Sequence, residues 1–120
     1  MELEECYEII GGDYYNVIRR LKKEERIEKY MRLFVKDTSY DNFIEYFQKE
    51  DFKEAFRMIH SLKGICINLS FDKLGQVAGE ITELLRNDDA NTNLVKELIP
   101  RLKSEYSKTV SGIMAYMNEK

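Results

Sequence analysis

The chain has 120 residues, of which 43% are hydrophobic and 34% charged, and its formal net charge is −3. This length suits one domain with a hydrophobic core, so we interpret residues 1–120 as a single domain. The lysines and arginines are interleaved with acidic residues, as in the segment 22–26, which argues against nucleic acid as a partner. No run approaches the ~18 apolar residues of a membrane span, and the acidic first residues do not resemble a signal peptide. We therefore expect a cytoplasmic protein with no membrane segment.

Apolar residues in the first half of the chain recur at the spacing of amphipathic helices. A short helix is predicted from Leu3 to Ile10, ended by the glycine pair 11–12. Asp13 is well placed to cap a second short helix that runs to about residue 21. A third helix follows over residues 27–35.

The second half of the chain continues the same pattern. A break at residues 37–39 precedes a helix around residues 43–47, and a turn at 49–51 leads into a longer helix over 52–69. Asp72 is expected to cap the next helix, which carries buried residues from 74 to 85.

Residues 87–91 have the composition of a loop, and the last helix is predicted over residues 95–117. Pro100 lies inside that helix, where proline removes a backbone hydrogen bond, so we expect a kink or a break there. Successive helices with short loops favour antiparallel neighbours. The predicted fold is all-α, an antiparallel up-down four-helix bundle with one or two short extra N-terminal helices.

The single histidine, His60, lies on the longer helix over 52–69. A rotation of about 100° per residue places it about 130° from the centre of the apolar stripe, at the rim or on the solvent face. Lys63, Gly64, Phe56 and Ile67 project on the same side. A lone histidine is often a surface residue without a function, but this neighbourhood favours a site. The glycine leaves room for another molecule, the lysine can neutralise an anion, and two apolar side chains on a polar face indicate docking.

Two kinds of chemistry are disfavoured at this histidine. A metal site is not expected, because one histidine beside a lysine matches no ligand pattern, and the two cysteines, Cys6 and Cys66, match no metal or redox spacing. Cys66 is predicted to point into the core as a reduced thiol, and Ser61 lies about 100° around the helix from His60. A hydrolytic dyad is therefore disfavoured. An exposed imidazole that acts as a nucleophile beside a cation fits phosphoryl transfer.

Residues 57–69, RMIHSLKGICINL, resemble the signature of histidine phosphotransfer (HPt) domains of two-component phosphorelays. The family pattern reads roughly A-H-x-L-K-G-x-x-x-x-L-G, with a further leucine four residues later. The positions that fall on it are His60, Leu62, Lys63, Gly64, Leu69 and Leu74. The resemblance implies a four-helix bundle whose histidine accepts phosphate from a receiver-domain aspartate or from a kinase and passes it on.

The resemblance assigns roles to individual residues. His60 would be the phosphoacceptor, Lys63 the cation that steadies the phosphoryl group, and Gly64 the clearance for a partner. The domain would have no nucleotide site and no cofactor, because Mg²⁺ belongs to the receiver. The chain departs from the family at Ser70, where glycine is usual, and at Thr82, where Gln or Glu often binds the histidine ring. Thr82 is therefore the candidate for orienting the imidazole.

The leading hypothesis is a phosphorelay carrier rather than an enzyme, with a covalent phosphohistidine and a docking surface made of Gly64, Phe56, Ile67 and Ser61. The partners would be response-regulator receivers, a sensor histidine kinase, or both, and a monomer is expected. One alternative is a helical adaptor that binds a receiver or kinase without carrying phosphate. Another is a phosphoacceptor domain cut from a larger kinase. The sequence names neither the cognate partners nor the direction of phosphate flow.

Overall fold

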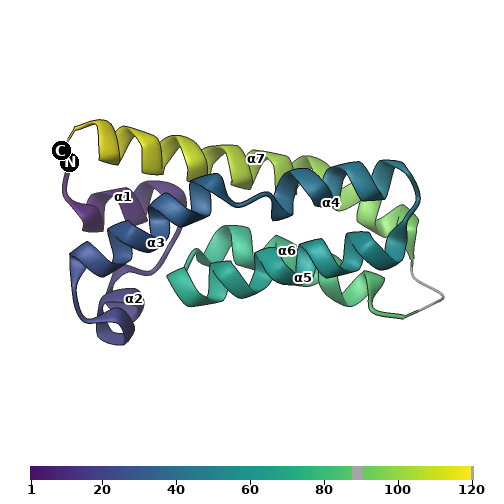
Figure 1. The fold of residues 1–120 in the computed structure, drawn as a ribbon, viewed down its shortest axis with the longest axis horizontal. Helices are drawn as coiled ribbons and strands as arrows, with labels where there is room; N and C mark the ends of the chain where they lie inside the picture. The colour runs from purple at the N-terminus through teal and green to yellow at the C-terminus, as the bar shows by residue number, and fades with distance from the viewer. Residues whose placement is uncertain (88–90, 120) are drawn as a thin grey trace.

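Seven helices make up the part of the chain that the computed structural model describes, residues 1–87 and 91–119. They are α1 (Leu3–Ile10), α2 (Tyr14–Leu21), α3 (Glu24–Lys36), α4 (Ser39–Gln48), α5 (Phe52–Leu69), α6 (Asp72–Leu85) and α7 (Thr92–Asn118). The described residues contain no strand. In Figure 1, α4, α5, α6 and the long α7 run side by side, α3 continues the line of α4, and α1 lies against α7. The predicted all-α bundle with two short N-terminal helices is confirmed.

The helix ends follow local sequence signals at most positions. Asp13 and Asp51 accept hydrogen bonds from the backbone N–H groups of Asn16 (2.9 Å) and Glu54 (3.3 Å), which caps α2 and α5. The predicted cap at Asp72 is wrong. Phe71 occupies the N-cap position of α6 and Asp72 is the first helical residue, because the Phe71 ring is drawn into the core and is only 1% exposed.

The last helix is continuous from Thr92 to Asn118 and is not broken at Pro100. Val95 and Leu102, on either side of the proline, are fully buried, while Pro100 itself is exposed. Tertiary packing on both sides therefore holds the helix together despite the lost hydrogen bond. The predicted loop at residues 87–91 falls partly on residues 88–90, which lie outside the described residues. Asn91 caps α7 by accepting from the Leu94 N–H at 3.2 Å.

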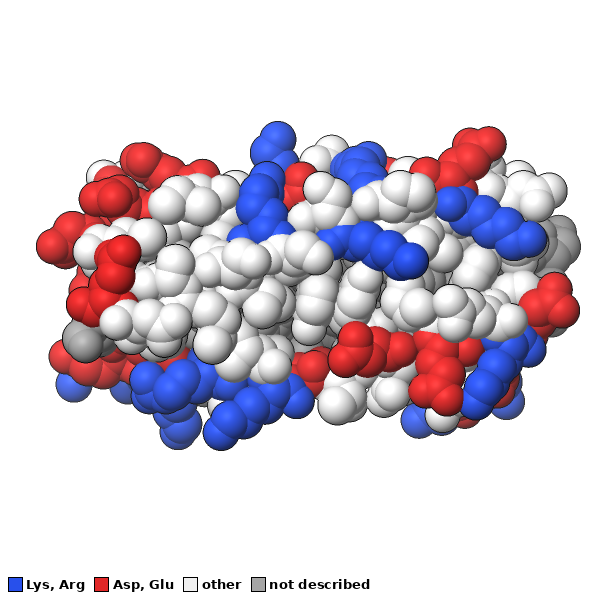
Figure 2. Space-filling model, turned by 90° about the horizontal axis from the view of Figure 1, so that it is seen from above, with Lys and Arg blue, Asp and Glu red and all other residues white. Residues whose placement is uncertain are grey.

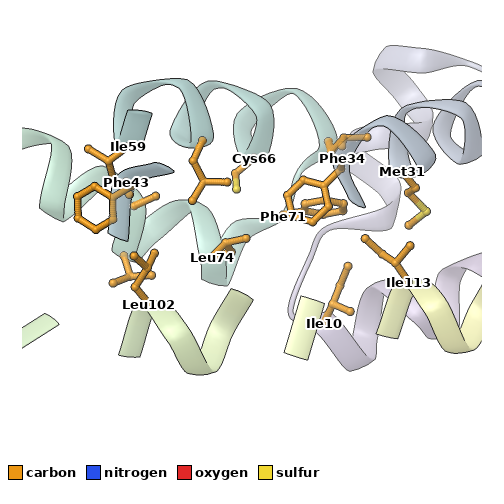
Figure 3. Packing of buried hydrophobic residues seen from close by; sticks show 14 of the residues in the cluster. Ile10, Met31, Phe34, Phe43, Ile59, Cys66, Phe71, Leu74, Leu102 and Ile113 are labelled. Atoms are coloured by element: carbon orange, nitrogen blue, oxygen red, sulfur yellow. The ribbon is translucent and has the colours of Figure 1, made fainter. Parts of the chain in front are cut away.

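An aromatic cluster joins the N-terminal helices to the bundle. The Phe71 ring, in the turn between α5 and α6, lies 5.2 Å from the ring of Phe34 on α3 and 5.8 Å from that of Tyr7 on α1, measured between centroids. Figure 3 shows Phe34 and Phe71 between two groups of core side chains, one that includes Ile59 and Leu74 and one that includes Ile10 and Ile113. Tyr106 on α7 stacks on Tyr40 of α4 at 3.9 Å, which closes the bundle between those helices.

The C-terminal end of α5 is held by α2. Ser70 adopts a left-handed conformation, with φ of 56°, at the position where the family usually has glycine. The Arg20 guanidinium donates hydrogen bonds to the carbonyls of Ile67 (2.8 Å) and Asn68 and to Ser70 Oγ (3.0 Å). Ser70 Oγ donates in turn to Asn16 Oδ1 at 2.7 Å. These bonds offset the strain of a non-glycine residue there and tie α2 to the helix that carries His60.

Replacing Arg20 with alanine is expected to lower the free energy of unfolding by about 1–2 kcal/mol, because three acceptors at the end of α5 lose a charged donor. Arg19 is the matched control, since its side chain is exposed and makes no hydrogen bond or ion pair within the described residues. Arg19→Ala should change stability by less than about 0.5 kcal/mol. Urea denaturation of both variants makes the comparison, and equal losses would show that the Arg20 bonds do not stabilise α5.

Candidate functional site

His60 stands on the outer face of α5. Its neighbours Ile59 and Leu62 point into the core and are 0% and 1% exposed, whereas the His60 side chain is exposed. This alternation is the consequence of the 3.6-residue helical repeat, which turns residue 60 away from the buried stripe. The imidazole is therefore open to a second molecule.

An aromatic ring covers one side of the imidazole. Phe56, one helical turn before His60, stacks on it with ring centroids 5.6 Å apart and an interplanar angle of 13°. The Arg86 guanidinium, from the end of α6, lies over the same Phe56 ring at 5.4 Å from its centroid. Phe56 thus contacts the imidazole of His60 on its own helix and the guanidinium of Arg86 at the end of α6, and the stack restricts the orientation of the imidazole.

Lys63 reaches toward α6 and meets a carboxylate there. Its Nζ lies 4.0 Å from Glu83 Oε1, and Arg86 Nη2 lies 3.0 Å from the same oxygen. The hydrogen bond and charge of Arg86, with smaller effects of Lys63 and His60, lower the pKa of Glu83. Glu83 is therefore ionised at neutral pH and forms a bridge between the two cations beside His60.

Gly64 leaves open space one turn after His60. A Cβ built at this position would meet no heavy atom within 4 Å, apart from the helix's own backbone nearby. The packing of this chain therefore does not demand a glycine here. Ile67, 61% exposed, continues the same face.

Ser61 borders this face on the side of α4. Its Oγ accepts a hydrogen bond from Ser39 Oγ at 3.1 Å. The contact links the His60 helix to α4 next to the imidazole.

The model of the Hpt domain family matches residues 24–112, well over half of the chain. The chain belongs to the Hpt domain family. Hpt domains carry phosphoryl groups in two-component phosphorelays, where they interact with receiver domains and kinases, so this chain is a histidine phosphotransfer domain. The match begins at α3, so α1 and α2 lie outside it. No curated protein and no solved structure matches the chain.

The side chain that an Hpt domain often directs at its histidine from the next helix is absent here. Thr82 is fully buried, and its hydroxyl donates to the Ala78 carbonyl of its own helix at 2.7 Å. Within residues 1–87 and 91–119 the imidazole of His60 makes no hydrogen bond. The prediction that Thr82 orients the ring is therefore wrong for this structure, and the Phe56 stack is the contact that restricts it.

Sequence reasoning missed Glu83 and Arg86 as members of the site of this Hpt domain. The available signal was their three-residue spacing, which is typical of an ion pair on a helix. Rotation about α6 places Glu83 about 100° from Thr82. Because Thr82 is buried, the next residue, Glu83, is the one that reaches Lys63 on α5.

The two cysteines of this Hpt domain are free thiols in the core. Burial raises the pKa of Cys66 and raises that of Cys6 to about 11, so neither is a thiolate at neutral pH. No helix in the described part of the chain is both long and apolar enough for a membrane crossing. Nor do three His, Cys, Asp or Glu side chains gather there in a way that could hold a metal ion.

The stack on Phe56 predicts an observable shift for the single histidine. Replacing Phe56 with leucine keeps an apolar side chain but removes the ring current, so the imidazole ¹H resonances should move toward those of an unstacked histidine. The proton spectrum of ¹⁵N,¹³C-histidine-labelled protein measures this directly. Phe52→Leu, two turns before His60 on the same helix, is the control and should leave those resonances in place. Unchanged resonances in Phe56→Leu would contradict the stacked arrangement.

Proposed function

We propose that His60 is the phosphoacceptor of this phosphorelay carrier and that it exchanges phosphate with receiver-domain aspartates. The observation that carries the proposal is an exposed imidazole in the family's His-x-Leu-Lys-Gly motif, with empty space over Gly64. A nucleophile that meets the active site of a second protein needs this clearance. The partner must come close enough for in-line attack.

The proposed step moves one phosphoryl group between two side chains. A lone pair of the neutral imidazole attacks the phosphorus of the aspartyl phosphate, and a P–N bond forms. The P–O bond to the aspartate breaks, and the carboxylate leaves with the electron pair. The reverse reaction returns the group to a second receiver. Such transfer depends mainly on positioning and charge neutralisation, and the Phe56 stack supports the positioning of the ring.

Lys63 is proposed to supply the neutralising charge. Its ammonium lies at 4.0 Å from Glu83 Oε1, at the outer limit of an ion pair, and its side chain is 29% exposed. Arg86 holds Glu83 more closely, at 3.0 Å, so Lys63 is free to turn toward a phosphoryl group on His60. The positive charge of Lys63 stabilises the transferring phosphoryl group whether it moves to His60 or away from it.

In this proposal the chain acts in the cytoplasm as a single domain and a monomer, without a nucleotide or cofactor of its own. The Mg²⁺ needed for transfer is held by the receiver. The docking surface consists of Gly64, Phe56, Ile67 and Ser61. A receiver or a sensor histidine kinase can be the donor.

The test is transfer from a panel of receiver domains loaded with ³²P through acetyl phosphate. We expect at least one receiver to pass its label to the chain within minutes, in a linkage that is stable to alkali and labile to acid. Receivers that bind the chain without passing label in either direction would support an adaptor and contradict the carrier.

A further inference from the structure

The side chain of Lys63 lies against a glycine of the neighbouring helix α6. A Cβ built at Gly79 would stand 3.8 Å from Lys63 Cε and 3.9 Å from its Cδ, which is ordinary van der Waals spacing. The ammonium at the end of this stem lies 4.0 Å from Glu83 Oε1, one turn further along α6. Because residue 79 has no side chain, the stem of Lys63 rests on the surface of α6. Gly79 and Glu83 together hold Lys63 on that helix.

This contact between Lys63 and α6 is open to solvent. The side chain of Lys63 is 29% exposed and that of Glu83 is 60% exposed. A surface hollow of about 600 Å³, lined by residues of α6 and α7, adjoins both side chains. An exposed ion pair at such a distance is weak and exchanges readily for another partner. The ammonium can therefore leave Glu83 without disturbing the core.

The position of Lys63 distinguishes it from other paired cations of this chain. Figure 2 shows side chains of both signs around the face that α7 forms, and Arg101 of α7 lies 3.3 Å from Glu80 of α6. Lys63 differs because His60 lies three residues before it on the same helix. The Cβ atoms of residues at this spacing are about 5–6 Å apart. A phosphoryl group on His60 therefore comes within reach of the long, flexible lysine side chain.

The two acceptors that the ammonium can reach differ in charge. A phosphoryl group on a side chain carries about −1.5 to −2 charges at neutral pH. Glu83 carries a single charge, and Arg86 already donates to both of its oxygens, at 3.0 and 3.2 Å. Glu83 is the acceptor of Lys63 in the unloaded domain, whereas a phosphorylated His60 offers a stronger one. Phosphorylation therefore draws the ammonium from α6 to His60.

We infer that Gly79 and Glu83 are positioning residues that hold Lys63 on α6 while His60 is free and release it when His60 is phosphorylated. The inference rests on the proposed function, in which His60 carries the phosphoryl group. The contact with Glu83 stabilises the unloaded domain, so the loss of this contact offsets part of the stabilisation that Lys63 gives to phosphohistidine. Glu83 thereby favours transfer of the phosphoryl group onward to a receiver.

NMR of ¹³C,¹⁵N-labelled protein tests the movement of Lys63 directly. Nuclear Overhauser effects between the Lys63 side-chain methylene protons and the Gly79 Hα protons should be present in the unloaded domain. They should be lost once phosphoramidate has loaded His60, and they should remain in His60→Gln treated in the same way. Effects that persist in loaded wild type, or that are absent before loading, overturn the inference. Failure of His60 to load from phosphoramidate and from every receiver overturns the proposed function instead.

A second test compares Glu83→Gln with Glu80→Gln, the same change at a carboxylate of α6 that pairs with Arg101 instead of Lys63. Rates of transfer to and from a ³²P-labelled receiver give the equilibrium constant. Glu83→Gln should shift it about threefold toward the phosphorylated domain, the coupling expected of an exposed ion pair. Glu80→Gln should match wild type.

The same substitution in a Lys63→Ala background shows whether Glu83 acts through Lys63. We expect Glu83→Gln to have no effect on the equilibrium constant there, because the ammonium that Glu83 holds is gone. A threefold shift that survives Lys63→Ala, or equal equilibrium constants for Glu83→Gln and Glu80→Gln, overturns the inference.

Discussion

Replacing Gly64 with leucine is expected to slow phosphoryl transfer between this domain and a receiver by about 100-fold, because reacting groups displaced by about 1 Å lose rates of this order. A side chain at Gly64 would project from the face that carries His60. No heavy atom lies within 4 Å of the Cβ position, apart from nearby backbone of the same helix, so the chain itself accommodates a larger residue. Under the proposed function, a receiver that approaches the imidazole would collide with this larger side chain.

The fold of the Gly64→Leu variant should be as stable as wild type or more so, because leucine favours a helix interior by nearly 1 kcal/mol over glycine. Phosphoramidate, a small phosphodonor, should still load His60 in the variant. Ser107→Leu, at an exposed position on α7, is the matched control and should transfer normally. Normal receiver transfer by Gly64→Leu would contradict the clearance role. A marked loss of stability would contradict the open space seen here.

Replacing Phe71 with alanine is expected to lower the free energy of unfolding by about 3–5 kcal/mol, the usual cost of removing a fully buried aromatic ring. The ring is 1% exposed and contacts Phe34 and Tyr7, so its loss leaves a cavity where α1, α3 and the α5–α6 turn meet. The free energy of unfolding of a typical domain is roughly 5–15 kcal/mol, so this substitution removes a large part of it.

Equilibrium urea denaturation measures the effect of Phe71→Ala. The control is Leu33→Ala, because Leu33 is 54% exposed and its truncation should cost less than about 0.5 kcal/mol. If both variants lose the same free energy, the aromatic cluster does not hold the N-terminal helices to the bundle.

Hydrophobic spacing and helix-capping residues were sufficient to predict the bundle. The glycine pair after Ile10 and the cap at Asp13 mark two helix ends that the structure confirms. Two local expectations, a helix break at Pro100 and a cap at Asp72, were wrong where tertiary packing outweighs local preference. Burial of Val95 and Leu102 keeps α7 continuous through Pro100, and α6 begins at Asp72 itself, with the buried Phe71 at the N-cap position. Neither contact is visible in the local sequence.

The sequence predicted which site residues of α5 share one face, but it did not predict the contacts that α6 makes with them. Rotation along α5 placed His60, Phe56, Gly64 and Ile67 on one exposed or partly exposed face, as the structure has them. The contacts from α6 depend on the rotation of that helix about its axis relative to α5. Core packing sets this rotation. A resemblance that points to Thr82 therefore missed Glu83, the neighbouring residue that faces Lys63.

The central claim, that His60 carries the phosphate, can be measured directly because the chain has one histidine. Protein labelled with ¹⁵N-histidine is charged by a phosphorylated receiver and followed by ¹⁵N and ³¹P NMR. We expect one phosphoramidate ³¹P signal, a large shift of one imidazole ¹⁵N, and no such ³¹P signal in folded His60→Gln. Unchanged imidazole nitrogens in phosphate-loaded protein, or as much acid-labile phosphate on His60→Gln as on wild type, would contradict the claim.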